Sequence, residues 1–190
     1  NIINELINNN RVIGGLTEEA TFRASKLYSS FCKGKLIKTN SNCAELVKLS
    51  ENSFRDINIA FANELAAISS DLGINVWELI RLANRHPRVN ILSPGAGVGG
   101  HCIAVDPWFI VNQNPEKAKL VKQARLINDT KPQTIIGDVQ DYCQRYERHD
   151  KKIRIGLFGL SYKPDIDDMR NSPAVIIAKS LAEIFSGQVF

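Results

Sequence analysis

The longest periodic stretch of the chain runs from Asn42 to about Leu72, where apolar residues recur at helical spacing. At 3.6 residues per turn they fall on one face, which carries Leu46, Ile57, Phe61, Leu65 and Ile68. Gly73 then supplies the residue type that commonly follows the last turn of a helix. The pattern predicts one long amphipathic helix that buries its apolar face.

The opposite side of this predicted helix is polar in an unusual way. With about 100° between successive residues, one narrow stripe contains Lys48, Asn52, Asp56, Ile59 and Asn63 rather than the usual mixture of Glu and Lys. Asparagine lowers helix propensity, so two of them in one stripe favour a role in binding a ligand. A solvated face is the alternative interpretation.

Two further helices are predicted in the middle of the chain. One covers Asn75 to Asn84, with Asn75 as its N-cap. The other begins at Asn114-Pro115, runs to Arg148 with a kink at Pro132, and buries Leu120, Ala124, Ile127, Ile135, Ile136 and Val139. Helices this long in so small a domain are expected to pack against a second copy of the chain, which predicts a homodimer.

The N-terminal part follows a different pattern. Residues 11–15 and 36–39 predict two short strands, and between them Thr17 caps a helix that runs to about Lys33. This β-α-β order is typical of the tail of an α/β domain, because a strand needs partners that nothing earlier in the chain provides.

The C-terminal part predicts a strand over residues 152–156, then the loop 161–173 and a helix over 174–185. A loop at the carboxyl edge of a parallel sheet commonly binds ligands, and here Lys163 and Arg170 could hold phosphates. The alternative is a surface network in which these cations pair with Asp165, Asp167 and Asp168.

Together these patterns predict a mostly α fold, in which a central helical dimerisation domain is flanked by incomplete α/β, Rossmann-like segments. The expected domains are residues 1–41, the tail of an N-terminal α/β domain, and residues 42–150, the helical domain with a cysteine loop. Residues 151–190 would begin a C-terminal α/β domain.

The candidate chemistry lies in the stretch PGAGVGGHCIAVDP, residues 94–107. Its four glycines let the backbone approach a ligand and present N–H donors, which favour the reactive thiolate of Cys102. Asp106 lies four residues later, so in a turn of helix its carboxylate could share a face with the thiol. The alternative is a small buried cysteine with no chemical role.

The same stretch contains the spacing GxGxxG at Gly95, Gly97 and Gly100, which resembles a dinucleotide-binding fingerprint. That fingerprint needs a strand before it and a long helix after it. Pro94 precedes the first glycine, and Pro107 falls where the helix should continue. We therefore interpret this stretch as a loop and not as a cofactor cradle.

Composition narrows the class of protein. The 24 basic and 20 acidic residues are interspersed, so no nucleic acid is expected as a partner. The four cysteines form no CxxC pair, which predicts neither a zinc site nor a disulfide framework and favours a reducing cytoplasm. The apolar runs are too short to cross a bilayer, and the N-terminal residues do not form an export signal, so no membrane association is expected.

Four segments, taken in order, resemble the UDP-glucose/GDP-mannose dehydrogenases, and most closely the branch that acts on UDP-N-acetyl-D-mannosamine. They are RVIGGLT, AELVKLSENSFRDINIAFANEL, HPRVNIL with PGAGVGGHCIAVDPWF, and GLSYKPDIDDMRNSP. The resemblance covers essentially all 190 residues. It implies an NAD-dependent enzyme that oxidises the hydroxymethyl group of a UDP-sugar twice, through an aldehyde and a thioester, to a uronic acid.

The resemblance also implies roles for single residues. Cys102 matches the nucleophile, Lys48 and Asn52 match the pair that steadies the oxyanion and the catalytic water, and Asp106 matches the residue that assists proton transfer. The substrate-binding positions are Arg88, which would reach the partner subunit's substrate, and Gly99, Gly100 and Lys163. Arg170 matches an arginine that contacts the nucleotide cofactor.

Family members begin with a complete NAD-binding Rossmann domain and end with a complete nucleotide-sugar-binding domain. The resemblance therefore implies that residues 1–41 are the tail of the NAD-binding domain and that residues 151–190 begin the nucleotide-sugar-binding domain. We therefore expect a partial copy that does not reduce NAD by itself, whether it is a natural remnant, a fragment or a truncated product. The alternative function is a non-catalytic dimeric scaffold or a weak binder of nucleotide sugars.

Overall fold

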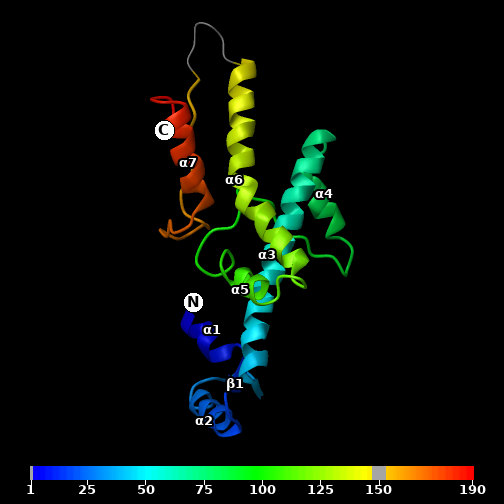
Figure 1. The fold of residues 1–190 in the computed structure, drawn as a ribbon, viewed down its shortest axis with the longest axis vertical. Coiled ribbons are helices and arrows are strands. Elements are labelled where there is room, and N and C mark those ends of the chain that lie inside the picture. Colours follow the sequence, from blue (N-terminus) through cyan, green and yellow to red (C-terminus); the bar gives the residue numbers. More distant parts are fainter. Residues whose placement is uncertain (1, 147–152) are drawn as a thin grey trace. The chain divides into compact units, whose positions relative to one another are not determined.

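The computed structural model describes residues 2–146 and 153–190, and it is mostly helical, as predicted (Figure 1). The chain forms two compact units, Asn1–Glu51 and Asn52–Phe190. Among the described residues, no helix has the length and apolar character needed to cross a membrane.

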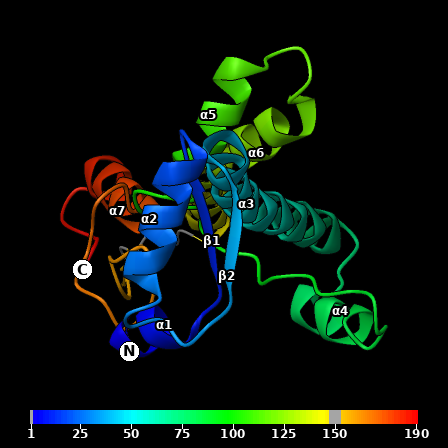
Figure 2. The ribbon, with the colours of Figure 1, turned by 90° about the horizontal axis from the view of Figure 1, so that it is seen from below.

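The first unit has the predicted β-α-β order. Strands β1 (Arg11–Gly15) and β2 (Leu36–Asn40) pair in parallel, with Arg11 opposite Leu36, and α2 (Glu18–Tyr28) packs against both (Figure 2). Thr17 caps α2, because its side-chain oxygen accepts the N–H of Ala20 at 3.1 Å. Helix α2 ends five residues earlier than predicted, and α1 (Ile2–Asn8) was not predicted.

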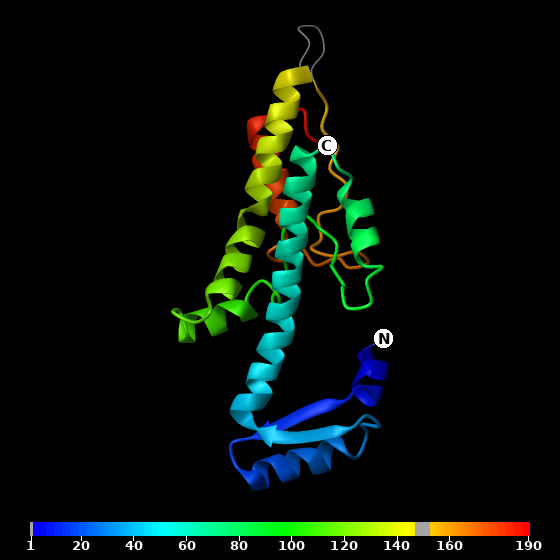
Figure 3. The same ribbon diagram turned by 90° about the vertical axis from the view of Figure 1, so that its right-hand side faces the viewer.

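Helix α3 (Ser41–Asp71) begins in the first unit and continues into the second as one uninterrupted helix (Figure 3). It ends as predicted: Gly73 takes a φ of +65°, and the N–H of Ile74 donates to the carbonyl of Ser69 at 2.8 Å. The next helix, α4 (Val76–Ala83), begins at the predicted N-cap Asn75.

The apolar core of the second unit lies between α6 (Lys119–Tyr146) and α7 (Pro173–Ile184), which lie side by side in Figure 1. Ile136 of α6 packs there with Ile177 and Leu181 of α7. Helix α5 (Asp106–Gln113) packs against α6 and connects it to the glycine-rich loop of residues 94–105, the glycine loop.

The predicted start of the second long helix is wrong. Helix α6 starts at Lys119 rather than at Pro115, because residues 114–118 form a separate turn in which Asn114 accepts the N–H groups of Lys117 and Ala118. Residues 147 and 148 of the predicted helix lie outside the described part of the chain.

The predicted strand over residues 152–156 is reduced, over its described residues, to an isolated parallel bridge between Ile155 and Val189. The N–H of Ile155 donates to Gln188, and its carbonyl accepts the N–H of Phe190 at 2.9 Å. A single bridge cannot become a regular strand without further neighbours.

Candidate functional site

The thiol of Cys102 is exposed at the end of the glycine loop. The carbonyl of Cys102 accepts the N–H of Val105 at 3.0 Å and that of Asp106 at 2.8 Å. These bonds close a turn from which α5 starts, with Pro107 in its first turn, where proline needs no hydrogen-bond partner. Cys102 and Asp106 therefore belong to one turn, and α5 is too short to complete a dinucleotide fingerprint.

Asp106 is joined to α3 by a short hydrogen bond. The side-chain N–H of Asn52 donates to Oδ2 of Asp106 at 2.5 Å, and only 4% of Asn52 is exposed. A bond to an ionised carboxylate is shorter and stronger than one between neutral groups. Residues that are 54 positions apart in the sequence thus meet beside the turn of Cys102.

Lys48 lies one turn before Asn52 on α3, within the first unit. Its side chain is exposed, and Nζ lies 3.6 Å from a carboxylate oxygen of Glu51. An ion pair this exposed contributes little to stability, so it leaves the ammonium group available for other partners.

Gly99 and Gly100 pack against the loop that precedes α7. A Cβ on Gly99 would lie 2.6 Å from the carbonyl oxygen of Asn171, and one on Gly100 would lie 2.9 Å from the ring of Tyr162. Gly100 also takes a φ of +84°, which other residues rarely adopt. Both glycines are therefore needed for the contact between the two loops.

The loop before α7 presents two cations. The guanidinium of Arg170 forks onto Asp168, with Nε to Oδ1 at 2.9 Å and Nη2 to Oδ2 at 2.6 Å. These hydrogen bonds lower the pKa of Asp168 to about 2, and the nearby His101 acts in the same direction. The Nζ of Lys163 lies 5.8 Å from the ring centre of Tyr162. Arg170 thus forms one of the ion pairs that the surface-network interpretation predicts.

Arg88 is exposed in the segment between α4 and the glycine loop. This segment is held by Asn84, whose amide donates to the carbonyl of Ile91 at 2.9 Å and accepts its N–H at 2.7 Å. Asn58 of α3 holds the neighbouring residues in the same way, through Asn90 and Leu92.

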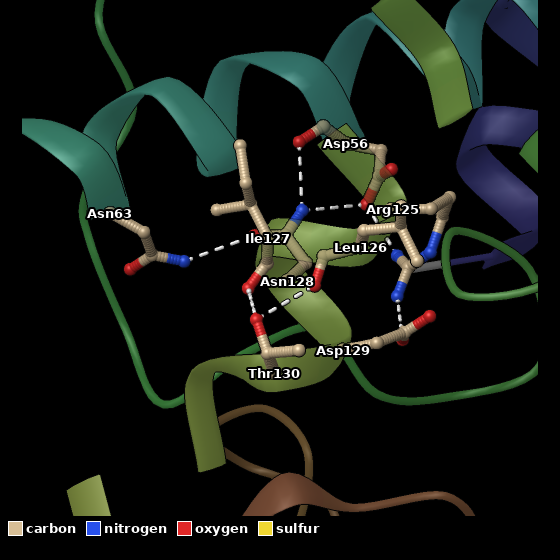
Figure 4. A network of polar contacts seen from close by, with 8 residues as sticks. All are labelled: Asp56, Asn63, Arg125, Leu126, Ile127, Asn128, Asp129 and Thr130. Carbon is tan, nitrogen blue, oxygen red and sulfur yellow. Dashed lines mark hydrogen bonds and ion pairs between the residues drawn. The ribbon is translucent and has the colours of Figure 1, made fainter. Parts of the chain in front are cut away.

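The sequence interpretation missed a buried polar network between α3 and α6 (Figure 4). Arg125 donates to Asp56 at 2.5 Å and to Asp129, and Asn128 donates to Asp56 at 2.8 Å. Asp56 and Arg125 are completely buried. Burial raises the pKa of Asp56, while the charge of Arg125 and the bond from Asn128 act in the opposite direction.

The polar stripe of α3 is therefore buried at Asn52, Asp56 and Asn63, where its interpretation as a solvated face is wrong, while Lys48 at its start is exposed. Asn52, Asp56 and Asn63 are 4%, 0% and 2% exposed. One available signal was their common helical spacing, because two asparagines and an aspartate that share one helical face are suited to a hydrogen-bonded interior.

Comparisons with known proteins identify the class of protein to which this chain belongs. Residues 42–130 match the central domain of the UDP-glucose/GDP-mannose dehydrogenase family, and residues 156–185 match the UDP-binding domain of the same family. Both matches describe nucleotide-sugar oxidoreductases. The chain belongs to the UDP-glucose/GDP-mannose dehydrogenase family.

Individual relatives agree with this assignment. The chain is 58% identical to the UDP-N-acetyl-D-mannosamine dehydrogenase of Yersinia pestis, over 97% of its own length and 45% of that protein. It is 51% identical to an NDP-N-acetyl-D-galactosaminuronic acid dehydrogenase of Ralstonia nicotianae, over 99% of its own length and 44% of the relative. The chain thus spans about half the length of the relatives it matches.

A solved structure has the same fold. The UDP-D-ManNAc dehydrogenase of Pyrococcus horikoshii superimposes with a TM-score of 0.88 at 44% identity, covering 99% of this chain and 44% of that one. The UDP-N-acetyl-mannosamine dehydrogenase of Staphylococcus aureus gives a TM-score of 0.84 at the same identity, over 96% of this chain and 43% of that one.

Proposed function

We propose that this chain carries the thiol site of an NAD-dependent dehydrogenase that oxidises a UDP-sugar, UDP-N-acetyl-D-mannosamine, to its uronic acid. The observation that carries the proposal is the 2.5 Å hydrogen bond between Asn52 and Asp106, because it joins two of the proposed catalytic residues beside Cys102. The substrate is taken from the names of several similar proteins, among them the Yersinia and Pyrococcus enzymes.

Each residue has a distinct role in this chemistry. Once the hydroxymethyl group has lost its first hydride and become an aldehyde, the Cys102 thiolate adds to the carbonyl carbon and forms a thiohemiacetal. Loss of a second hydride gives a thioester, which water cleaves to release the acid and the free thiol. Asp106 accepts a proton during these steps, while Lys48 and Asn52 stabilise the oxyanion; one such donor is worth about 2.7–4 kcal/mol.

The substrate is proposed to lie against the two loops that meet at Gly99 and Gly100. Lys163 is exposed beside them and would contact the anionic substrate. Arg88 is proposed to reach the substrate of the partner subunit. Because side chains at Gly99 and Gly100 would collide with the loop before α7, we expect these glycines to contribute backbone contacts only.

The described residues offer only part of a binding site for NAD. The exposed guanidinium of Arg170 suits a phosphate, although Asp168 occupies one side of it. Among the described residues, the GxGxxG spacing at Gly95 is followed by the eight-residue α5 rather than by a long helix. Arg170 is therefore proposed to contact NAD, which accepts hydride when bound.

We further propose that the protein acts as a homodimer in the cytoplasm and supplies uronic acids for polysaccharide biosynthesis. The support for the dimer is the apolar face of α3, where Phe54, Phe61 and Ile68 are 48–67% exposed. An apolar stripe of this kind on a long helix commonly meets its own copy across a two-fold axis. The expected contact is α3 against α3.

The test replaces the matching part of the Yersinia enzyme with residues 1–190 and measures uronic acid and NADH formed from UDP-N-acetyl-D-mannosamine. We expect an active chimera in which Cys102→Ser forms no acid, while Cys43→Ser, a change at another exposed cysteine, has normal activity. The 190-residue chain alone is expected to form no NADH. Normal acid formation by the Cys102→Ser chimera would overturn the thioester mechanism.

A further inference from the structure

The loop that carries Cys102 is hydrogen-bonded to α3 at both of its ends. At its start, the N–H of Gly95 donates to Oδ1 of Asn63 at 2.9 Å. At its end, Asn52 donates to Asp106. Asn52 and Asn63 are eleven residues apart on one helix, which separates the two attachment points by about 16 Å. The loop therefore spans two points of a rigid element.

The orientation of the Asn63 amide is set by its neighbours. Nδ2 of Asn63 donates to Oδ1 of Asn128 at 3.0 Å, and Nδ2 of Asn128 donates to the carboxylate and the carbonyl of Asp56. Asn128 is 1% exposed, so water does not offer it alternative partners. Its two polar atoms are thus both used within the protein.

The direction of this chain of hydrogen bonds follows from the ion pair at its far end. Ionised Asp56 can only accept, and Arg125 can only donate. Asn128 must therefore turn its N–H groups toward Asp56 and its oxygen toward Asn63. Asn63 must in turn donate to Asn128, which leaves its own oxygen to accept the N–H of Gly95. A flip of either amide would place two donors or two acceptors face to face.

We propose that Asn63 and Asn128 are positioning residues for Cys102. The Asp56–Arg125 pair fixes the orientation of both amides, so that the oxygen of Asn63 accepts the N–H of Gly95 at the start of the glycine loop. Within the described part of the chain, the side chain of Asn128 bonds to Asn63 and Asp56 and not to the loop itself. The importance of the loop rests on the proposed function, in which Cys102 is the nucleophile. The chain of hydrogen bonds from Asp56 through Asn128 and Asn63 to Gly95, which we call the relay, rests only on the geometry of α3, α6 and Gly95.

Asn58 offers a matched control on the same helix. It holds residues 90 and 92 through its amide, with its donor 3.0 Å from the carbonyl of Asn90 and its acceptor 3.0 Å from the N–H of Leu92. It is half-buried, and its bonds do not include Asp56 or Asn128. Removing its amide loosens the chain before the loop and leaves the relay intact.

The first test measures amide hydrogen exchange at Gly95 by NMR in the 190-residue chain. Both Asn63→Leu and Asn128→Leu are expected to lower the protection of Gly95 by about tenfold, the effect of losing one buried hydrogen bond, while Asn58→Leu leaves it unchanged. Asn63→Asp retains the acceptor but places a charge beside Asn128, and we expect an intermediate loss. Protection of Gly95 that is absent in the wild type, or that survives Asn128→Leu, would overturn the relay.

The second test compares alkylation of Cys102 with that of Cys43, which is exposed in the first unit and serves as an internal reference. In Asn63→Leu and Asn128→Leu, the ratio of the Cys102 rate to the Cys43 rate should change about threefold or more, toward the ratio measured in the urea-unfolded chain. The control Asn58→Leu should retain the wild-type ratio. A wild-type ratio equal to the unfolded one, or an unchanged ratio in both variants, contradicts positioning.

Urea unfolding of each variant separates loosening of the loop from loss of the fold. If a leucine variant does not fold, Asn63→Gln or Asn128→Gln is measured instead, because the longer amide is misplaced but retains its chemistry. Neither readout uses turnover. An active Cys102→Ser chimera would therefore overturn the proposed function while the exchange of Gly95 still reports on the relay.

Discussion

The two faces of α3 have exchanged the environments that their side chains would ordinarily take. The apolar face leaves Phe61 48% and Ile68 54% exposed, whereas the polar face buries Asn52, Asp56 and Asn63 almost completely. At about 100° per residue the two sets lie on opposite sides of the helix. Helical periodicity therefore identified the faces correctly but not which of them is interior.

The difference between the two faces of α3 shows that polar side chains can be buried when hydrogen-bond partners surround them. Buried polar groups are costly unless each finds a partner, and on α3 those partners come from α6, α5 and the glycine loop. The described residues leave Phe61 and Ile68 on the apolar face about half exposed, and we propose that a second copy of the chain covers this face.

The largest effect is expected when the buried face loses its cation. Arg125→Met leaves the carboxylate of Asp56 buried without its ion pair, which should lower the free energy of unfolding by about 3–5 kcal/mol in urea titrations. The double variant Asp56→Leu/Arg125→Met should recover most of this loss. Arg81→Met, which removes a pair whose side chains are 62% and 61% exposed, is the control and should cost about 1 kcal/mol or less.

The opposite face is tested by Phe61→Asp, which places a charge on the exposed apolar stripe. We expect sedimentation to show a dimer for the wild type and a monomer for this variant, a loss of at least about 2 kcal/mol of association free energy. Ser70→Asp adds the same charge on the other side of α3, also at an exposed position, and should leave the dimer intact. A folded wild-type monomer at tens of micromolar would contradict the dimer.

A smaller effect should appear in the pH dependence of stability. Burial raises the pKa of Asp56 in the folded chain above its usual 3.8. The folded state therefore binds this proton more tightly, and the stability so gained is present below pH 3.8 and is lost as pH rises through the raised folded pKa. Relative to the Asp56→Leu/Arg125→Met variant, the wild type should become less stable over this range. A constant or rising difference would contradict the raised pKa.

The smallest effect concerns the pair of Asp168 with the exposed Arg170. Arg170→Leu should raise the pKa of Asp168 from about 2 toward 3.8 in an NMR titration, because it removes the hydrogen bonds that favour the ionised form. The stability that this pair contributes is present above pH 3.8 and is lost as pH falls through about 2. Lys163→Leu is the control, and its titration of Asp168 should match the wild type.

Several features of the site could be predicted from residues close in sequence. Cys102 and Asp106 share one turn because they are four residues apart, and the caps at Thr17, Asn75 and Gly73 were local signals. The contact of Asn52 with Asp106 was implied only by the family resemblance. Arg125 and Asn128 were missed, because a charged residue in an amphipathic helix ordinarily faces solvent.

The sequence by itself determined where most helices and strands lie, which positions share a helical face, and which turn carries the thiol. These follow from backbone propensity, side-chain period and capping, all of which act over a few residues. Only the tertiary structure decided that the polar face of α3 is buried, that Asp56 meets Arg125, and that Gly99 and Gly100 lie against the loop before α7. Burial depends on which distant segments supply complementary donors and acceptors, and periodicity along one helix contains no such information.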